Sequence, residues 1–514
     1  MRRNTLAALL ALLLLGTLGL TACSGGSELE EQEEPWYALE QEEEEEEETI
    51  KLTSFALAWH QDQTMDPITC ADGIQSYVAS LLYEPLFELD GTFQPQSCLC
   101  DTYTVSEDGL SWTLHIRSGV AFSDGTQLSA GDVADCLRRA MSSQRYGTRL
   151  STVRSVTANS REEQVVIRLS QPNGNLPALL DIPIVKSGTE EELVPVGTGP
   201  YVYITDGSGA YLAANGGWWK GAGHPVDRIE LVNAKDDDTV RYLFTSKEIH
   251  LYAEELTGDS ATLTGRLDCV DVPTATMQYV GVNARREDLS GAAVRRAISA
   301  GIDRQKLVDG YLSSHGVPAA APLHPVSPLY PEDLSSSYSY ETWYAAMTEA
   351  GLTDGEDPVT LKLLVNSESS EKVAIAQSIA QSLSAFDLTV TVESLPWEEF
   401  LSAVAAGNFD LYYGETRLTA DWDVSRLVGT GGSMNYGGWS NTTTDTLLNA
   451  FRSSEDQKAN AVSLYRHLSQ EMPLIPVCFK SLSVLTQSGT VENIQSTQSN
   501  LFYHFSDWTI HMAS

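Results

Sequence analysis

The chain has few basic residues for its length and lacks the common sequence signals of hydrolytic enzymes. Its 514 residues include 32 Lys and Arg against 70 Asp and Glu, which gives a formal net charge of −38. Nucleic acids and anionic lipid surfaces attract basic proteins, so this charge argues against both kinds of partner. Neither a Gly-x-Ser-x-Gly elbow nor a His-Glu-x-x-His zinc pair occurs in the sequence. The absences favour a binding protein, with an exported hydrolase as the rival class.

A recognisable metal motif is also missing. Six cysteines follow Cys23, and the nine histidines are scattered along the chain. A structural zinc site usually combines two closely spaced cysteine pairs or a cysteine pair with clustered histidines, and Cys98 and Cys100 have no such partners. We therefore expect no metal and no cofactor. An exported chain could pair its cysteines in several ways, and the sequence leaves that pairing open.

Only one long apolar run is present, and it lies at the N-terminus. Arg2 and Arg3 precede the apolar residues 6–20, a layout typical of an export signal and too short to span a bilayer comfortably. The Leu-Thr-Ala sequence immediately before Cys23 resembles the lipobox of bacterial lipoproteins, in which the thiol takes a diacylglycerol. We predict a signal peptide over residues 1–22, lipid modification of Cys23, and contact with the membrane through this anchor alone. The alternative is an ordinary signal peptide whose removal leaves a cysteine by chance.

The segment after Cys23 has almost no aliphatic residues. Thirteen glutamates lie between residues 24 and 49, including an unbroken run over 42–48. Such a segment cannot bury enough apolar surface to offset its ordering entropy, and its like charges extend it. We expect residues 23–49 to form a disordered acidic tether.

Residues 50–514 are too many for one compact core and suffice for two or three lobes. Residues 111–117 alternate apolar and polar side chains, as a half-buried strand does. Ser129 and Asp132 have the spacing of a helix capping box. Residues 361–365, 371–386 and 388–392 read as strand, helix and strand, which indicates a βαβ unit and a parallel sheet. The expected fold class is therefore α/β.

Residues 292–312 have the periodicity of one amphipathic helix. The side chains expected to face inward are Val294, Ile298 and Leu307. The side chains expected to face solvent are Arg295, Arg296 and Arg304.

Several segments, in order along the chain, resemble motifs of one family, the family 5 extracellular solute-binding proteins of peptide and nickel ABC importers. The most specific is Trp-Thr-Leu-His-Ile-Arg-Ser-Gly-Val-Ala-Phe-Ser-Asp-Gly over residues 112–125, continued through residue 133. The remaining segments are Met-Asp-Pro at 65–67, Gly-Thr-Gly-Pro-Tyr at 197–201, residues 215–221, residues 294–304, Asn-Phe-Asp at 408–410 and Thr-Ala-Asp-Trp at 419–422. The resemblance covers nearly all of the chain after the tether.

This resemblance implies a two-lobed clamp of the large cluster C type of periplasmic binding protein, with a hinge between the lobes. Residues 50–276 would form lobe I with a small subdomain, residues 277–476 lobe II, and residues 477–514 would return to lobe I. Two strands would cross between the lobes near residues 277–283 and 473–479. Such a protein is a monomer without enzymatic activity or cofactor. It works outside the cytoplasm, here tethered to the membrane by its lipid, and delivers a solute to an ABC permease.

The resemblance also implies that Asp421 pairs with the free α-amino group of a bound peptide; from the residues alone, a helix N-cap or a surface carboxylate is the alternative. Peptide binders of the family carry a tryptophan shortly before this motif, whereas this chain has Glu415 and Arg417 nearby. That departure implies a different side-chain pocket or a ligand that is not a peptide. Trp422, Tyr436 and Trp439 could supply stacking surfaces for a ligand, although core packing would explain each equally well. Trp59 and His60 are expected to face the cleft from the other lobe.

We predict from these features a substrate-binding lipoprotein of an ABC importer that captures an oligopeptide or dipeptide. Three alternatives stay open. The protein could be a sensor that passes a peptide signal to another partner, a binder of a nickel chelate, a sugar or haem, or an exported hydrolase.

Overall fold

The computed structural model describes residues 51–513, except Asp72, Ala222, Gly258, Asp259, Ala261, Thr262, Thr264, Glu356 and Glu455. The predicted signal peptide over residues 1–22, the lipidation of Cys23 and the tether over residues 23–49 all lie outside the described residues. No helix in the described part is long and apolar enough to cross a bilayer. The six cysteines after Cys23 all lie in that part, and Cys98, Cys100, Cys136, Cys269 and Cys478 form no disulfide there.

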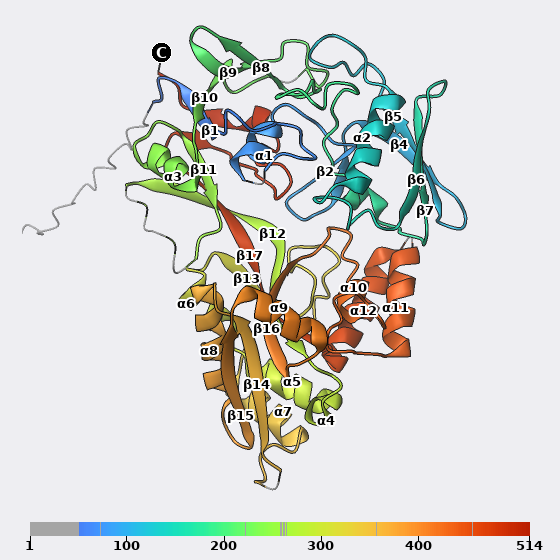
Figure 1. The fold of residues 1–514 in the computed structure, drawn as a ribbon, viewed down its shortest axis with the longest axis vertical. Coiled ribbons are helices and arrows are strands. Elements are labelled where there is room, and N and C mark those ends of the chain that lie inside the picture. The colour runs from blue at the N-terminus through green and yellow to red at the C-terminus, as the bar shows by residue number, and fades with distance from the viewer. Residues whose placement is uncertain are drawn as a thin grey trace, which may run out of the picture. The chain divides into compact units, whose positions relative to one another are not determined.

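One lobe, at the top of Figure 1, contains two four-stranded sheets. The first has the order β1-β10-β9-β8, with β1 and β10 parallel, and the second has the order β4-β5-β7-β6, against which α2 packs. The C-terminal part of the chain returns to this lobe and adds Phe502, Phe505 and Trp508 to its core. The elements of this upper lobe are β1 Phe55–Trp59, α1 Ile74–Ala79, β2 Phe87–Leu89, β3 Pro95–Ser97, β4 Cys100–Val105, β5 Ser111–Ile116, α2 Ala130–Ser142, β6 Val153–Asn159, β7 Gln164–Leu169, the 3-10 helix η1 Leu176–Leu179, β8 Tyr201–Asp206, β9 Gly209–Ala214, β10 Arg228–Asn233, α3 Asp237–Thr245, β11 Leu251–Glu254, β18 Val491–Glu492, the 3-10 helix η2 Phe505–Asp507 and β19 Thr509–Ile510.

A seven-stranded sheet runs from the upper lobe into the lower one, in the order β11-β17-β12-β16-β14-β15, with β13 also paired to β17. The lower lobe is built around its part from β12 to β15. Helix α8 packs on β14 and β15, and α11 packs on α12 beside the sheet. The elements of this lobe and of the two long strands that enter it are β12 Leu267–Val282, α4 Glu287–Ser290, α5 Ala292–Ala300, α6 Arg304–Tyr311, β13 Gly316–Pro318, α7 Tyr340–Glu349, β14 Val359–Asn366, α8 Ser370–Leu383, β15 Leu388–Leu395, α9 Trp397–Ala406, β16 Leu411–Arg417, α10 Ser425–Val428, α11 Thr442–Ser453, α12 Gln457–Glu471 and β17 Leu474–Gln487.

The predicted local elements are confirmed where the sequence pattern is strong. Strand β5 alternates half-buried and buried residues along its whole length. Ser129 caps α2, and its hydroxyl accepts a hydrogen bond from the backbone N–H of Asp132, whose carboxylate accepts one in return from the N–H of Ser129. Strands β14 and β15 are parallel and joined by α8, as the βαβ prediction requires.

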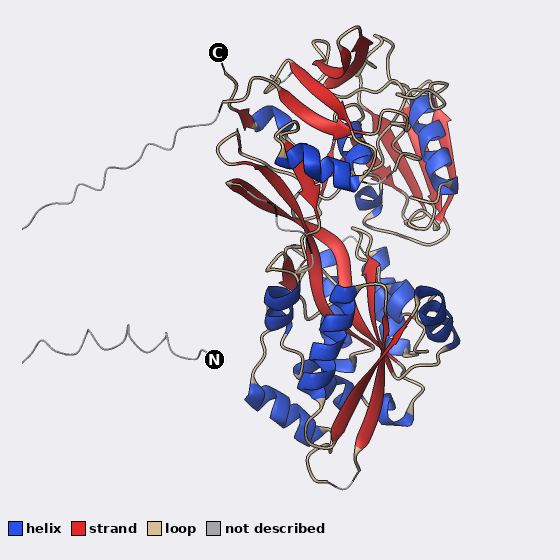
Figure 2. Ribbon diagram, turned by 60° about the vertical axis from the view of Figure 1, so that its left-hand side comes forward, coloured by secondary structure: helices blue, strands red, loops and turns tan. Residues whose placement is uncertain are grey.

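Strands β12 and β17 carry the chain between the lobes (Figure 2). They pair antiparallel from Leu267 opposite Gln487 to Gly281 opposite Leu474, with an irregularity between Pro273 and Met277. At one end β17 pairs with β11 of the upper lobe, and at the other end β12 pairs with β16 of the lower lobe. The two strands contain all but one residue of each range expected for the crossings, and they extend beyond these ranges at their upper-lobe ends, to Leu267 and Gln487.

The single helix expected over residues 292–312 is wrong. The chain instead forms α5 and α6, separated by a short break in which Asp303 caps α6. Two of the three arginines expected to face solvent are buried, because Arg295 is 1 % and Arg304 5 % exposed.

These two arginines are buried because backbone carbonyls surround them. Arg295 donates to the carbonyls of Leu289, Ser290, Glu471 and Met472, and its guanidinium lies over the ring of Trp439 at 4.8 Å. A buried charge is tolerated when its hydrogen-bonding groups are satisfied in this way. The helical periodicity could not show it, because Glu471 and Met472 are far away in the sequence.

Candidate functional site at the lobe junction

Asp421 lies in the turn that follows β16 and is 5 % exposed. Its Oδ1 accepts a hydrogen bond from the hydroxyl of Thr419 at 2.5 Å and another from the backbone N–H of Asp423 at 3.3 Å. Burial, and secondarily the charge of Asp423, raise the pKa of Asp421 above its ordinary value. A nearby cation stabilises a buried carboxylate more than it stabilises an exposed carboxylate.

The second oxygen of Asp421 bonds to the upper lobe. The side-chain amide of Asn173, in the loop before η1, donates to Oδ2 of Asp421 at 2.9 Å. The next residue, Gly174, donates its backbone N–H to the carbonyl of Arg452 on α11 at 2.7 Å. A Cβ at Gly174 would lie 2.4 Å from the carbonyl oxygen of Ser454, so this close approach requires glycine. The loop therefore seals Asp421 from the side of the upper lobe.

An aromatic cluster lies beside Asp421. This junction cluster consists of Phe93, His324, Trp422 and Phe479, which come from the β2–β3 turn, the loop after β13, the turn after β16 and β17. The ring centroids of Phe93 and Trp422 are 5.1 Å apart in an edge-to-face contact, and Trp422 is 0 % exposed. Phe93 belongs to the upper lobe yet packs in a hydrophobic cluster made largely of lower-lobe residues. The cluster thus joins the two lobes.

His324 makes the junction cluster sensitive to pH. Its Nδ1 accepts a hydrogen bond from the backbone N–H of Val326 at 3.1 Å, while its Nε2 is buried without a partner in the described residues. Burial lowers the pKa of His324 to about 4. The folded protein therefore favours the neutral ring. The contribution of His324 to the free energy of unfolding is fully present above about pH 6.5, the pKa of histidine in the unfolded chain.

Acidification is expected to weaken the fold through this histidine. As the pH falls from about 6.5 towards 4, His324 contributes a loss of up to about 3 kcal/mol in the free energy of unfolding. His324→Asn keeps an acceptor near the Nδ1 position and removes the titration. Its unfolding free energy, measured by urea denaturation at several pH values, should fall less steeply with acid than that of the unchanged protein. Parallel curves for the two proteins would contradict this prediction.

A second polar group at the junction contains Glu415. Its carboxylate lies 3.2 Å from Nζ of Lys372, 3.4 Å from Nζ of Lys480 and 3.1 Å from the amide nitrogen of Gln278. Lys480, on β17, also pairs at 2.5 Å with Glu255, which follows β11 of the upper lobe. Burial by itself would raise the pKa of Glu415, but the charges of Lys480 and Lys372 outweigh it, and the pKa lies below its ordinary value.

Arg417 is not the partner of Glu415. It lies two residues further along β16, its side chain is exposed, and it has no ion pair among the described residues. Tyr436 and Trp439 lie in the loop before α11. The ring of Tyr436 is half-buried against Tyr412 at a centroid distance of 6.3 Å, and Trp439 is largely covered by the guanidinium of Arg295.

Trp59 and His60 lie at the end of β1 in the upper lobe. Trp59 is buried and packs against Tyr203 at a centroid distance of 5.6 Å. His60 is half-buried, with its Nδ1 2.7 Å from the carbonyl oxygen of Ala234. Both side chains thus have contacts within their own lobe, and a contact of either residue with a ligand stays a prediction.

Of the predicted residues, the structure places Asp421 and Trp422 at the junction and Glu415 in its charged group. The sequence reading missed Asn173, Lys372 and Lys480, which complete these arrangements. The sequence could have indicated Lys480, since it is a charged residue directly after the apolar start of β17. It could not have indicated Asn173, because this residue lies 248 residues from its partner Asp421.

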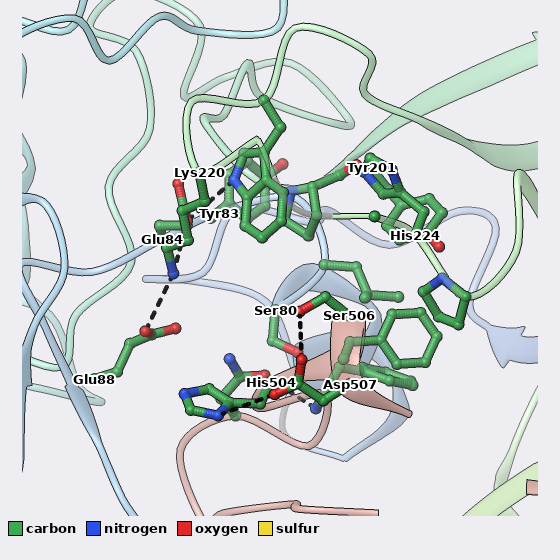
Figure 3. Close-up of a pocket in the computed structure, with 18 residues that line it drawn as sticks. Ser80, Tyr83, Glu84, Glu88, Tyr201, Lys220, His224, His504, Ser506 and Asp507 are labelled. Carbon is green, nitrogen blue, oxygen red and sulfur yellow. Dashed lines mark hydrogen bonds and ion pairs between the residues drawn. The ribbon is translucent and has the colours of Figure 1, made fainter. Parts of the chain in front are cut away.

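A cavity of about 220 Å³ occupies the upper lobe, away from these groups (Figure 3). Lys220 lies 3.3 Å from the carboxylates of both Glu84 and Glu88, and the indoles of Trp218 and Trp219 donate to Glu84. Burial raises the pKa of Glu84, although the charge of Lys220 opposes it. The charged groups of this cavity pair with one another, and none of the predicted ligand contacts lines it.

Comparisons with known proteins agree on the fold. A family model described as bacterial extracellular solute-binding proteins, family 5 Middle, matches residues 94–435. The glutathione-binding protein GsiB of Salmonella paratyphi A is 25 % identical over 458 residues, which cover 82 % of this chain and 87 % of that protein. The periplasmic murein tripeptide-binding protein MppA, in an unliganded open form, aligns with a TM-score of 0.75 at 17 % identity over 90 % of this chain and 98 % of that one. A nickel ABC transporter protein from Bacillus halodurans aligns with a TM-score of 0.73 at 19 % identity over 88 % of this chain and 98 % of that one.

The expected two-lobed α/β fold is confirmed by these alignments and by the sheets described above. Proteins of the matching family bind solutes outside the cytoplasm for ABC importers, and the family is one of binding proteins and not of enzymes. Its model spans well over half of the sequence, from the β2–β3 turn to the loop before α11. The chain belongs to the bacterial extracellular solute-binding proteins of family 5.

Proposed function

We propose that this protein binds a short peptide between its lobes and that the peptide's α-amino group pairs with Asp421. The observation that supports this proposal most directly is the buried Asp421 carboxylate at the lobe junction. Its Oδ2 accepts a hydrogen bond from an N–H of the opposite lobe. Asn173 supplies that N–H in this structure, and a ligand ammonium offers the same kind of donor with a positive charge. A charge-assisted hydrogen bond is the stronger of the two.

Binding then requires the loop of Asn173 to withdraw from Asp421. Residues 50–276 and 277–476 act as the two lobes, and β12 and β17 as the hinge. Separation of the lobes exposes the carboxylate, and closure around a peptide restores its shielding from water. The ligand shifts the equilibrium between open and closed forms by its differential affinity for them.

The remaining predicted contacts are assigned to the rest of the peptide. Arg417 offers an exposed guanidinium without an ion pair in the described residues, which suits a carboxylate. Glu415, Tyr436 and Trp439 lie in the same lobe, whereas Trp59 and His60 would contribute from the upper lobe once the lobes separate.

The relatives support a small peptide. GsiB is named for glutathione, which is a tripeptide, and MppA for a murein tripeptide. We further propose that Cys23 carries the lipid that holds the protein at the outer face of the membrane. There it would present its solute, as a monomer, to an ABC permease.

Titration calorimetry with tripeptides tests the proposal. A peptide with a free amino terminus should bind at least about thirtyfold more tightly than the same peptide after N-acetylation, because truncating one partner of a buried charged pair costs at least about 2 kcal/mol. A C-terminally amidated peptide is the matched control for charge. Equal affinity of the free and acetylated forms would contradict the proposal, and binding of a nickel–histidine complex alone would point to a different solute.

A further inference from the structure

A thiol, a carboxylate and an imidazole meet at the strand crossing, outside the site described above. The potential ligand atoms of Cys269, Asp271 and His315 all lie within 4.8 Å of one another. His315 Nδ1 is 2.9 Å and 3.0 Å from the two carboxylate oxygens of Asp271, and Cys269 Sγ is 3.9 Å from the nearer oxygen.

The backbone explains why these residues meet. Cys269 and Asp271 are two residues apart on β12, so their side chains project from the same face of the sheet. His315 directly precedes β13, whose Gly316 pairs with Lys480 of β17. The carbonyl of His315 also accepts a hydrogen bond from the backbone N–H of Ser481 at 3.2 Å. Strands β12 and β13 both pair with β17, and this pairing brings the three side chains together.

Ser483 orients the carboxylate of Asp271 from the neighbouring strand. It lies opposite Asp271 in the β12–β17 pairing and is buried. Its hydroxyl donates to Asp271 Oδ1 at 2.7 Å and lies 3.2 Å from His315 Nδ1. A supporting hydrogen bond of the kind made to Asp271 fixes ligand orientation in protein metal sites.

We propose that Cys269, Asp271 and His315 form a binding site for a zinc-class divalent cation. Sulfur, nitrogen and oxygen donors are all ligands of Zn²⁺, and three protein ligands plus water complete a tetrahedron. Donors around tetrahedral zinc are roughly 3.4 to 3.6 Å apart, so the cluster needs only small side-chain adjustments. On binding, the thiol proton passes to solvent. Nδ1 of His315 lies at hydrogen-bond distance from the carboxylate of Asp271, which only accepts, so the ring proton moves from Nδ1 to Nε2 through solvent and leaves Nδ1 free to coordinate.

The place of the site gives the ion a role beyond the proposed peptide binding. Cys269 and Asp271 lie on the part of β12 near the upper lobe, since β11 and β12 both pair with β17 there, while β13 joins β17 further towards the lower lobe. An ion bound to all three residues braces the crossing strands beside the hinge. It also protects a thiol that is otherwise exposed in an extracytoplasmic protein.

The test is metal titration of the purified full-length protein after chelator treatment, with a coloured competitor for Zn²⁺. We expect one tight equivalent, and Cys269→Ser and His315→Gln should each weaken it at least about tenfold. His504→Gln is the matched control, because His504 is exposed beside the carboxylate of Asp507 at 3.7 Å but belongs to no three-residue cluster of metal-ligating groups among the described residues. This variant should bind zinc as the unchanged protein does.

Cobalt gives a readout specific to the thiolate. Co²⁺ bound at this site should show sulfur-to-metal charge-transfer absorption that disappears in Cys269→Ser and persists in His504→Gln. The proposal is overturned if the two ligand variants bind zinc as tightly as the unchanged protein. It is equally overturned if cobalt shows no thiolate absorption, or if Cys269 forms a disulfide between two copies of the chain.

Discussion

Asp421→Asn is expected to weaken the binding of a peptide with a free amino terminus about a hundredfold, which corresponds to about 2.7 kcal/mol. The substitution keeps the shape of the side chain but removes the charge that pairs with the ligand ammonium. Calorimetric titration of the same tripeptide into both proteins measures the change. The N-acetylated peptide should bind the two proteins with similar affinity, because acetylation has already removed the ammonium that pairs with Asp421.

A folding defect of Asp421→Asn should not account for the loss of affinity. Asp421 is buried and its pKa is raised, so a neutral isostere does not remove a favourable charge from the unliganded protein. The control is Asp423→Asn, since Asp423 lies in the same turn but faces Arg452 at 3.6 Å. Its effect on affinity should stay below about threefold. Unchanged peptide affinity in Asp421→Asn would refute the role assigned to this carboxylate.

Arg304→Met should lower the free energy of unfolding by about 3 to 5 kcal/mol. The guanidinium donates to the carbonyls of Ala319 and Pro476 at 3.0 and 2.9 Å, and to the carbonyl and hydroxyl of Ser299 at 3.0 and 2.8 Å. Methionine fills similar volume but leaves these buried oxygens without donors. Burial lowers the pKa of Arg304 to about 10, so the side chain is charged at neutral pH.

Urea denaturation measures this loss, and Arg296→Met is its control. Arg296 is partly exposed and pairs at 2.5 Å with Glu349, so removal of its charge should cost at most about 1 kcal/mol. Equal denaturation midpoints for the two variants would show that the Arg304 contacts do not hold α6 against β17.

Short-range patterns were sufficient for much of the fold. The capping box at Ser129, the alternation of β5 and the βαβ unit of β14, α8 and β15 each depend on residues close in sequence, and all three are present. The order of family motifs along the chain also predicted the two-lobed class. Local periodicity failed at Arg295 and Arg304, because some of the carbonyls that satisfy these arginines, those of Glu471, Met472 and Pro476, come from residues more than 170 positions away.

The site was predicted less completely than the fold. The motif around Asp421 indicated the carboxylate, but not the Asn173 amide that caps it from the other lobe. The sequence placed Glu415 and Arg417 near the Asp421 motif, but it did not show that β12, α8 and β17 bring Gln278, Lys372 and Lys480 to Glu415. The cluster of Cys269, Asp271 and His315 has no spacing typical of a metal motif, because one member joins through strand pairing 44 residues later.

Native mass spectrometry of the purified protein tests the central claim most directly, because it weighs what remains bound between the lobes. The account predicts a set of bound masses that correspond to short peptides with free amino termini. Asp421→Asn should lose these masses, while Asp423→Asn should keep them. One discrete non-peptide mass, retained in Asp421→Asn, would contradict the account.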